Sequence, residues 1–303
     1  MRNIIQGTKT TWIDILKPAG QDVDFLREQY HFPDMVLDQL IPRSYHPRLE
    51  VGQDYLFLII NYPTYHEMDH DVTPRELDII LTKNALVTNH GRPLFLLENF
   101  FKTCRRPEIE GEKYLDKGPG YVLFFILDIF WRDCLAKLDR INEDMEKTEK
   151  KMFHGKEQEM VREISHIKTD VIDFWRIIEP QLEIMKLLEK DGPKFFGEEL
   201  SLHFSGILGN YEKIWQTVKA LKETIFAMEK TNQSLLTTKT NEIIKVLTIF
   251  SVIMMPLTLL ASIWGMNLRL PFGEHPFGFL FVAAIMAIVL AGMFTYFRKK
   301  GWL

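Results

Sequence analysis

The sequence predicts an α+β membrane protein: an N-terminal α/β domain, a long helical stalk and two C-terminal transmembrane helices. Three observations predict this architecture. Short β-branched and aromatic runs occur in residues 1–120, and from Tyr121 apolar residues recur at every third or fourth position. From Val246 to Phe297 the only charged residues are Arg269 and Glu274. The chain therefore divides into a charged first part and an apolar last part.

Residues 1–120 are expected to form the α/β domain with a small sheet. Tyr55–Asn61 is a β-branched and aromatic run, and Leu77–Leu81 and Ala85–Thr88 flank a plausible turn at residues 82–84. Arg92–Thr103 has the pattern of a short helix with a proline near its start.

Residues 121–200 are expected to form an antiparallel pair of helices. The first covers Tyr121–Phe153, and the second runs from about Glu157 to Glu189. Charged residues of both signs between the apolar rows indicate solvated faces. Asp191–Pro193 is predicted to end the pair as a turn.

From about Asn210 to Trp264 nothing interrupts a helix except Pro256. At 1.5 Å per residue such a helix is ~83 Å long. Its polar half carries an apolar stripe spaced four and three residues apart, made of Tyr211, Trp215, Val218, Leu221, Ile225 and Met228. The spacing indicates a packed stalk over residues 201–245.

Two uncharged stretches, residues 246–264 and 277–297, are each long enough to cross a hydrocarbon core of ~30 Å. Lys239 and Lys245 precede the first stretch, and the basic tail 298–303 follows the second. The excess of Lys and Arg on these flanks places both termini in the cytoplasm and residues 265–276 outside. The expected location is the cell (inner or plasma) membrane, crossed twice.

Composition and motifs argue against other classes. The net charge of −4 offers no basic surplus for nucleic acid. Cys104 and Cys134 match no metal-ligand or redox spacing and are expected to be reduced packing thiols. We find no Gly-rich phosphate loop and no nucleophile–base arrangement, so we expect no enzyme activity and no cofactor.

A polar stripe follows the helix that enters the first span. Its members recur at intervals of three and four: Asn241, Ile244, Thr248, Ser251, Met255, Thr258 and Ser262. The stripe is compatible with packing of small residues between helices. It is equally compatible with the lining of a water-filled conduit, which two spans cannot enclose without further copies of the chain. The stripe lacks carboxylates, and its neutral oxygens suit a hydrated divalent ion.

The run Trp264-Gly265-Met266-Asn267, preceded by the segments 240–249 and 254–258, strongly resembles the CorA family of magnesium and cobalt channels. The resemblance implies a funnel-shaped homopentamer whose first span lines the pore. It implies an outer selectivity ring at Gly265, Met266 and Asn267. It further implies pore-lining positions at Asn241, Ile244, Leu247, Ser251, Met255, Thr258 and Ser262, with Leu247 rather than Thr248.

The sequence departs from the family pattern at regulatory and external positions. Glu274 is the candidate acid of the external loop, but Arg269 opposes it. Gly206 and Lys230 stand where the family often has the acids of a magnesium sensor. Other acids, such as Glu223 or Glu229, are therefore the candidates for a regulatory metal site.

The resemblance implies a channel that conducts Mg²⁺, with Co²⁺ or Ni²⁺ as further ions, down the membrane potential. One alternative is a zinc transporter of the related ZntB type. Another, from a different class, is a two-span membrane sensor. Twelve external residues leave no room for a sensing domain, and no output motif is present.

Overall fold

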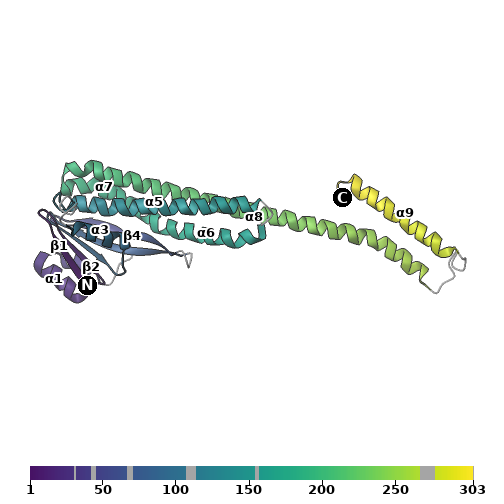
Figure 1. Cartoon of the computed structure of the whole chain (residues 1–303), viewed down its shortest axis with the longest axis horizontal. Helices are drawn as coiled ribbons and strands as arrows, with labels where there is room; N and C mark the ends of the chain where they lie inside the picture. Colours follow the sequence, from purple (N-terminus) through teal and green to yellow (C-terminus); the bar gives the residue numbers. More distant parts are fainter. Residues whose placement is uncertain are drawn as a thin grey trace. The chain divides into compact units, whose positions relative to one another are not determined.

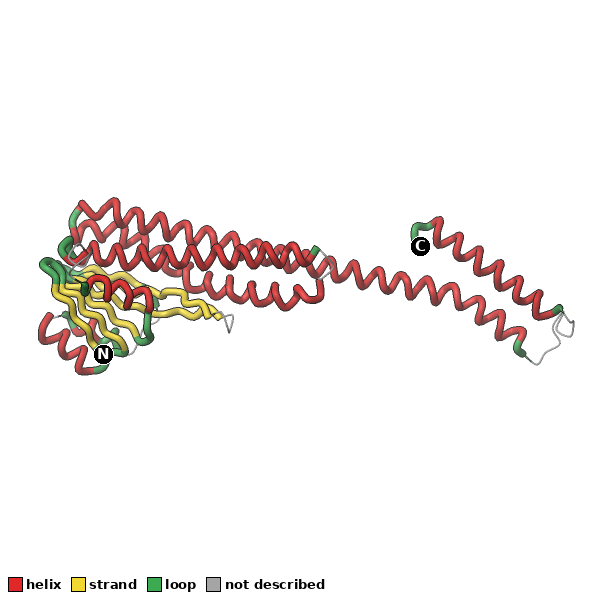
Figure 2. Tube along the Cα trace, in the orientation of Figure 1, coloured by secondary structure: helices red, strands yellow, loops and turns green. Residues whose placement is uncertain are grey.

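The computed structural model describes all residues except 31, 42–45, 67–70, 107–113, 154–156, 267–276 and 303, and it gives no side-chain detail for residues 66, 71 and 157. The chain forms two compact units, Met1–Glu229 and Lys230–Leu303. Figure 1 labels the elements along the chain, and Figure 2 distinguishes helix from strand.

Unit 1 contains a six-stranded sheet with the order β1-β2-β6-β5-β4-β3. The pairing of β2 with β6 is parallel, and the other pairings are antiparallel. The strands are β1 (Arg2–Gln6), β2 (Thr11–Leu16), β3 (Arg48–Val51), β4 (Leu56–His66), β5 (Asp71–Leu81) and β6 (Ala85–His90). The sheet confirms the predicted α/β domain.

Helices pack on both faces of the sheet, and successive strand residues point alternately to one face and the other. Ile13 and Ile15 pack into a buried cluster with Leu26 of α1 (Gly20–Tyr30) and Val36 of α2 (Asp34–Leu37). Trp12, on the other face, packs edge-on against Phe101 of α3 (Phe95–Cys104), with ring centroids 4.9 Å apart. The expected helix at Arg92 thus begins at Phe95, after Pro93.

The predicted turn at residues 82–84 is confirmed. The amide of Thr82 donates to the carbonyl of Ala85 at 2.9 Å, and the amide of Ala85 donates to the Thr82 hydroxyl at 3.0 Å. The two strands it joins, β5 and β6, pair antiparallel from Leu81↔Leu86 onwards. A threonine hydroxyl that replaces a backbone acceptor is typical of such tight turns.

The hairpin of β4 and β5 extends past its neighbours, since β3 pairs only with residues 56–59 and β6 only with residues 78–81. Its free edges are protected. Pro63 and Pro74 lie opposite each other and offer no amide donor. The Pro63 carbonyl accepts from Lys137 at 3.0 Å, and the side chain of Gln181 donates to the Asn61 carbonyl and accepts from its amide. The free edge of β4 from Asn61 to Pro63 is therefore closed to an additional strand.

Three helices follow the sheet, rather than the predicted pair: α5 (Pro119–Met152), α6 (Glu157–Ile178) and α7 (Leu182–Phe196). The predicted turn at Asp191–Pro193 is wrong, because α7 continues through it to Phe196. The break lies instead at the 3₁₀ turn η1 (Glu179–Gln181), which contains Pro180. Gly192 is buried against the ring of Phe204, which would lie 3.0 Å from an added Cβ. Packing thus overrides the local signal of a Gly-Pro pair.

Helix α8 (Ser201–Trp264) is 64 residues long and begins at the first residue of the predicted stalk, before Asn210; α9 (Gly278–Lys299) follows in unit 2. The apolar stripe predicted for the stalk packs within unit 1. Tyr211, Val218, Leu221, Ile225 and Met228 are buried, and Trp215 is half-buried.

A buried ion pair joins the parallel strands β2 and β6. Nε2 of His90 lies 3.1 Å from the carboxylate of Asp14, and Nδ1 lies 2.8 Å from the carbonyl of Arg92. Both partners are acceptors, so only the doubly protonated imidazolium donates to both. The Asp14 carboxylate also accepts from Thr88 at 2.7 Å, and Thr88 accepts from the indole of Trp12 at 3.0 Å.

Burial lowers the pKa of His90, but the hydrogen bond and charge of Asp14 outweigh it, with help from the Arg92 carbonyl and the charge of Glu98. The pKa of His90 is therefore raised above 6.5. Protonated His90 therefore stabilises the folded chain. This stabilisation is fully present below the pKa of His90 in the unfolded chain, and it is lost as the pH rises through the pKa in the folded chain.

We predict that His90→Gln, which never carries a charge, destabilises the protein more at about pH 5.5 than at about pH 9. Thermal unfolding of the full chain in detergent, followed at both pH values, measures the difference. A difference in Tm between wild type and variant that is equal at the two pH values would contradict the charged pair.

Candidate functional site

Unit 2 has almost no core of its own. In the most apolar windows of α8 and α9 the mean hydropathy is 2.3 and 2.4, yet only 6% and 0% of the residues are buried. Such helices need either lipid or other protein around them. Both are long and apolar enough to cross a membrane, as the sequence predicts.

One face of α8 lies against α9. In the described part of α8 from Lys245 onwards, the less exposed residues form one helical stripe: Lys245, Ile249, Ile253, Pro256, Leu257, Leu260 and Trp264. A 390 Å³ cavity between the helices is lined by Ala261 and Trp264 from α8 and by Phe279 and Val282 from α9. At the other end, Nζ of Lys245 donates to the carbonyl of Gly301 at 3.3 Å.

The seven predicted pore-lining side chains lie on the opposite face of α8. All are exposed within the single chain: Asn241, Ile244, Leu247, Ser251, Met255, Thr258 and Ser262. Ser251 precedes Ile253 by two residues, which corresponds to about 200° around a helix. The polar stripe therefore points away from α9 and is available to other copies of the chain. Both Leu247 and Thr248 are exposed, so the chain by itself accommodates either position.

The hydroxyls of this face have a defined orientation. The hydroxyls of Thr248, Ser251 and Thr258 donate to the carbonyls four residues earlier, at 2.7, 2.9 and 2.9 Å. A hydroxyl has one proton and two lone pairs, so its outward side can only accept. Acceptors suit the water shell of a cation, whose hydrogens point outward. The face can therefore hold a hydrated cation without replacing its waters.

The run Trp264-Gly265-Met266-Asn267 at the end of α8 is described only up to Met266. The amide of Gly265 donates to the Ala261 carbonyl at 2.9 Å, and an added Cβ would lie 3.2 Å from the same oxygen. Glycine thus permits a close approach at the helix end. Met266 is exposed. Asn267, Arg269 and Glu274 lie outside the described residues.

The candidate regulatory acids, Glu223 and Glu229, are both exposed. Glu229 forms an ion pair with Lys168 of α6, with 2.8 Å between Nζ and the carboxylate. A metal at Glu229 would compete with Lys168. Within the described ranges, no group of three or more His, Cys, Asp or Glu side chains is placed to hold a metal ion.

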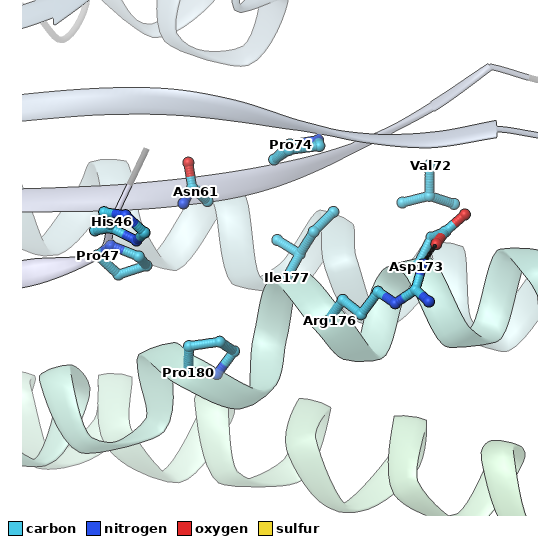
Figure 3. Close-up of a pocket in the computed structure, with 9 residues that line it drawn as sticks. All are labelled: His46, Pro47, Asn61, Val72, Pro74, Asp173, Arg176, Ile177 and Pro180. Carbon is cyan, nitrogen blue, oxygen red and sulfur yellow. Dashed lines mark hydrogen bonds and ion pairs between the residues drawn. The ribbon is translucent and has the colours of Figure 1, made fainter. Parts of the chain in front are cut away.

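A second cavity, of 390 Å³, lies in unit 1 between the outer part of the β4–β5 hairpin and α6 (Figure 3). Its apolar wall includes Val72, Pro74 and Ile177. Asp173 and Arg176 lie side by side on α6. The guanidinium of Arg176 is 2.9 Å from the carboxylate of Asp173, so the two charges offset each other. Among the described residues that line the cavity Asp173 is the single acid, so they provide no cluster of acidic ligands for a divalent cation.

Comparison with known proteins gives a consistent result. The family model described as CorA-like Mg²⁺ transporter protein matches residues 7–299. The cobalt/magnesium transport protein CorA of Thermotoga maritima is 26% identical over 295 residues, which cover 97% of this chain and 83% of that protein.

Two solved structures share the fold. The complete CorA magnesium transporter from Methanocaldococcus jannaschii has a TM-score of 0.83 at 23% identity, covering 97% of this chain and 92% of that one. The ZntB cytoplasmic domain from Vibrio parahaemolyticus is more distant, with a TM-score of 0.57 at 16% identity over 78% of this chain and 90% of that one. The predicted succession of α/β domain, long helix and two apolar helices is confirmed.

We predict that single cysteines distinguish the two faces of α8. Ser251→Cys and Thr258→Cys should react with a charged, water-soluble thiosulfonate at least about tenfold faster than Ile253→Cys and Leu260→Cys, because only a hydrated thiol ionises readily. The native cysteines should contribute little reaction of their own. Cys104 and Cys134 are buried, and burial raises the pKa of Cys104 to about 12. Equal rates on both faces would contradict a hydrated stripe.

Proposed function

Because the chain belongs to the family of CorA-like Mg²⁺ transporter proteins, we propose that five copies form a channel that passes hydrated Mg²⁺ across the cell membrane. The first span of each copy lines the pore, and both termini lie in the cytoplasm. The family is one of transporters, which is not an enzyme class. The divalent cation is the cargo of the channel and not a resident cofactor.

One observation carries this proposal: the exposed stripe on α8 points away from α9 and presents neutral acceptor oxygens. Copies arranged around an axis would turn these stripes toward one another. The lining would then contact the waters of the ion and not the bare ion. Mg²⁺ releases its waters reluctantly, so a lining of this kind suits it better than a cage of carboxylates.

The choice of ion rests on the same chemistry. The Thermotoga maritima relative is named for cobalt and magnesium transport, and hydrated Co²⁺ and Ni²⁺ present similar water shells. Zn²⁺ favours nitrogen and sulfur ligands, which the seven proposed lining positions do not supply apart from the thioether of Met255. The proposal therefore ranks Mg²⁺ and Co²⁺ above Zn²⁺.

Flux into liposomes that contain the purified chain tests the proposal. Mg²⁺, Co²⁺, Ni²⁺ and Zn²⁺ are compared with and without a pH gradient. We expect Mg²⁺ influx that follows an imposed negative internal potential and ignores the pH gradient, because the proposed pore has no intramembrane acid. Flux of Zn²⁺ alone, driven by protons, would favour the ZntB-like alternative.

We predict that Thr258→Val lowers Mg²⁺ flux about tenfold, equivalent to ~1.4 kcal/mol. The change removes the acceptor oxygen and keeps the shape of the side chain. Thr295→Val on α9 is the matched control, since its hydroxyl makes the same type of bond, to the Ala291 carbonyl at 2.9 Å. Equal loss of flux in both variants would show that the Thr258 oxygen has no special role.

The resemblance assigns the outer ring to Asn267, with Gly265 and Met266 preceding it. We predict that Asn267→Ala abolishes Mg²⁺ flux while assembly is intact, because alanine offers no oxygen to the hydrating waters. Asn267→Asp should bind cations more tightly and conduct poorly, since a charged ring retains what it binds. Liposome flux and size-exclusion chromatography measure the two properties. Wild-type flux in the alanine variant would remove Asn267 from the mechanism.

Leu247 and Met255 are the bulky apolar residues proposed to close the pore by excluding water. Their exposed fractions in the single chain are 63% and 76%. We predict that Leu247→Ala raises basal flux, because a smaller ring admits water. Flux measured at several internal Mg²⁺ concentrations tests the change, with Leu259→Ala, also exposed on α8 but outside the proposed pore set, as control. Unchanged basal flux in Leu247→Ala would argue against this gate.

The proposed regulatory acids are Glu223 and Glu229. Gly206 and Lys230 stand where the resemblance places the acids of a magnesium sensor. We therefore expect inhibition by internal Mg²⁺ to be weak, or to run through Glu223 or Glu229, of which Glu229 is paired with Lys168.

A further inference from the structure

We propose that Lys245 and the C-terminal tail, residues 298–302, form a binding site for the phosphate headgroup of an anionic phospholipid in the cytoplasmic leaflet. This inference rests on the proposed orientation of the chain. It adds a lipid ligand that neither the pore nor the outer ring requires.

The backbone of the tail forms a defined helix-capping turn. Gly301 has a positive φ of 67° and its amide donates to the Arg298 carbonyl at 3.2 Å, while the amide of Trp302 donates to the Phe297 carbonyl at 3.0 Å. These two bonds define a Schellman motif at the end of α9. The hydrophobic contact typical of the motif is present, because the rings of Phe297 and Trp302 stack with centroids 5.8 Å apart.

The motif gathers cations at one end of the hairpin. Arg298, Lys299 and Lys300 lie in the last turn of α9 and its cap, and Lys245 reaches the Gly301 carbonyl from α8. The bond to Gly301 occupies only one of the three ammonium protons of Lys245. Among the described residues from 241 to 302, Glu242 is the single acid. The cluster therefore has a clear positive excess.

Aromatic side chains favour a lipid over a free anion as the source of the phosphate. Tyr296 and Trp302 are 57% and 39% exposed, and Nζ of Lys300 lies 5.7 Å from the centroid of each ring. Tyrosine and tryptophan prefer the headgroup level of a bilayer, where their apolar bodies meet acyl chains. The apolar span ends at Phe297, directly beside the cations. A phospholipid offers both an anionic headgroup and acyl chains at this level.

The site also has a place in the proposed mechanism. Lys245 lies two residues before Leu247 on α8. A bound headgroup would therefore hold the cytoplasmic end of the pore-lining segment of α8 to the tail that follows α9. Juxtamembrane lysines and arginines each contribute about fivefold in affinity for an anionic membrane surface.

Native mass spectrometry of the full chain in detergent tests the proposal, with titration by phosphatidylglycerol, by phosphatidylcholine and by inorganic phosphate. We expect phosphatidylglycerol to bind more tightly than phosphatidylcholine. Lys245→Gln should weaken this binding about fivefold, and the triple change of Arg298, Lys299 and Lys300 to Gln on the order of a hundredfold. The triple change of Lys186, Lys190 and Lys194 to Gln on α7 removes the same charge and should have no effect.

Trp302→Ala keeps every charge and should also weaken binding, because the tail loses its stack. Equal affinity for the two lipids, or unchanged affinity in Lys245→Gln, would overturn the proposal. Displacement of the lipid by millimolar inorganic phosphate would show a site for soluble anions and would overturn the lipid assignment. The readout needs neither transport nor five copies, so its failure is distinct from failure of the channel proposal.

Discussion

The described part of unit 2 must remove apolar helix surface from water without a core of its own. Almost none of the side chains in the apolar parts of α8 and α9 are buried within one chain, whereas the sheet and helices of unit 1 bury a conventional core. A bilayer can cover the outer side of the hairpin, but the polar stripe of α8 is poorly suited to lipid. This mismatch is the physical reason to expect further copies around that stripe.

The serine and threonine hydroxyls of the stripe resolve a second difficulty. A hydroxyl group that finds no acceptor inside a membrane is costly. Here the hydroxyls of Thr248, Ser251 and Thr258 each donate to a carbonyl of the helix backbone. The remaining lone pairs accept from water. The same bonds that make these residues tolerable in an apolar helix thus leave them able to hold a hydrated cation weakly enough for it to leave.

The sequence predicted the parts of the chain that depend on long-range averages. Charge depletion located both apolar helices, and spacing located the stalk stripe and the polar stripe. Local signals were less reliable. Asp191–Pro193 has the composition of a turn, but Gly192 makes room for Phe204 and the helix continues. The buried pair of Asp14 and His90 was not predicted, because a charged residue in a strand normally indicates an exposed face. The Schellman motif could have been expected from Gly301 after a basic turn, followed by an aromatic residue.

The central claim is that the stripe on α8 is completed by other copies of the same chain. The mass of the purified protein in lipid nanodiscs, measured by native mass spectrometry, tests this claim most directly. The account predicts a particle of five 35.7 kDa chains. A particle with the mass of one or two chains, found under conditions that preserve Mg²⁺ flux, would contradict it.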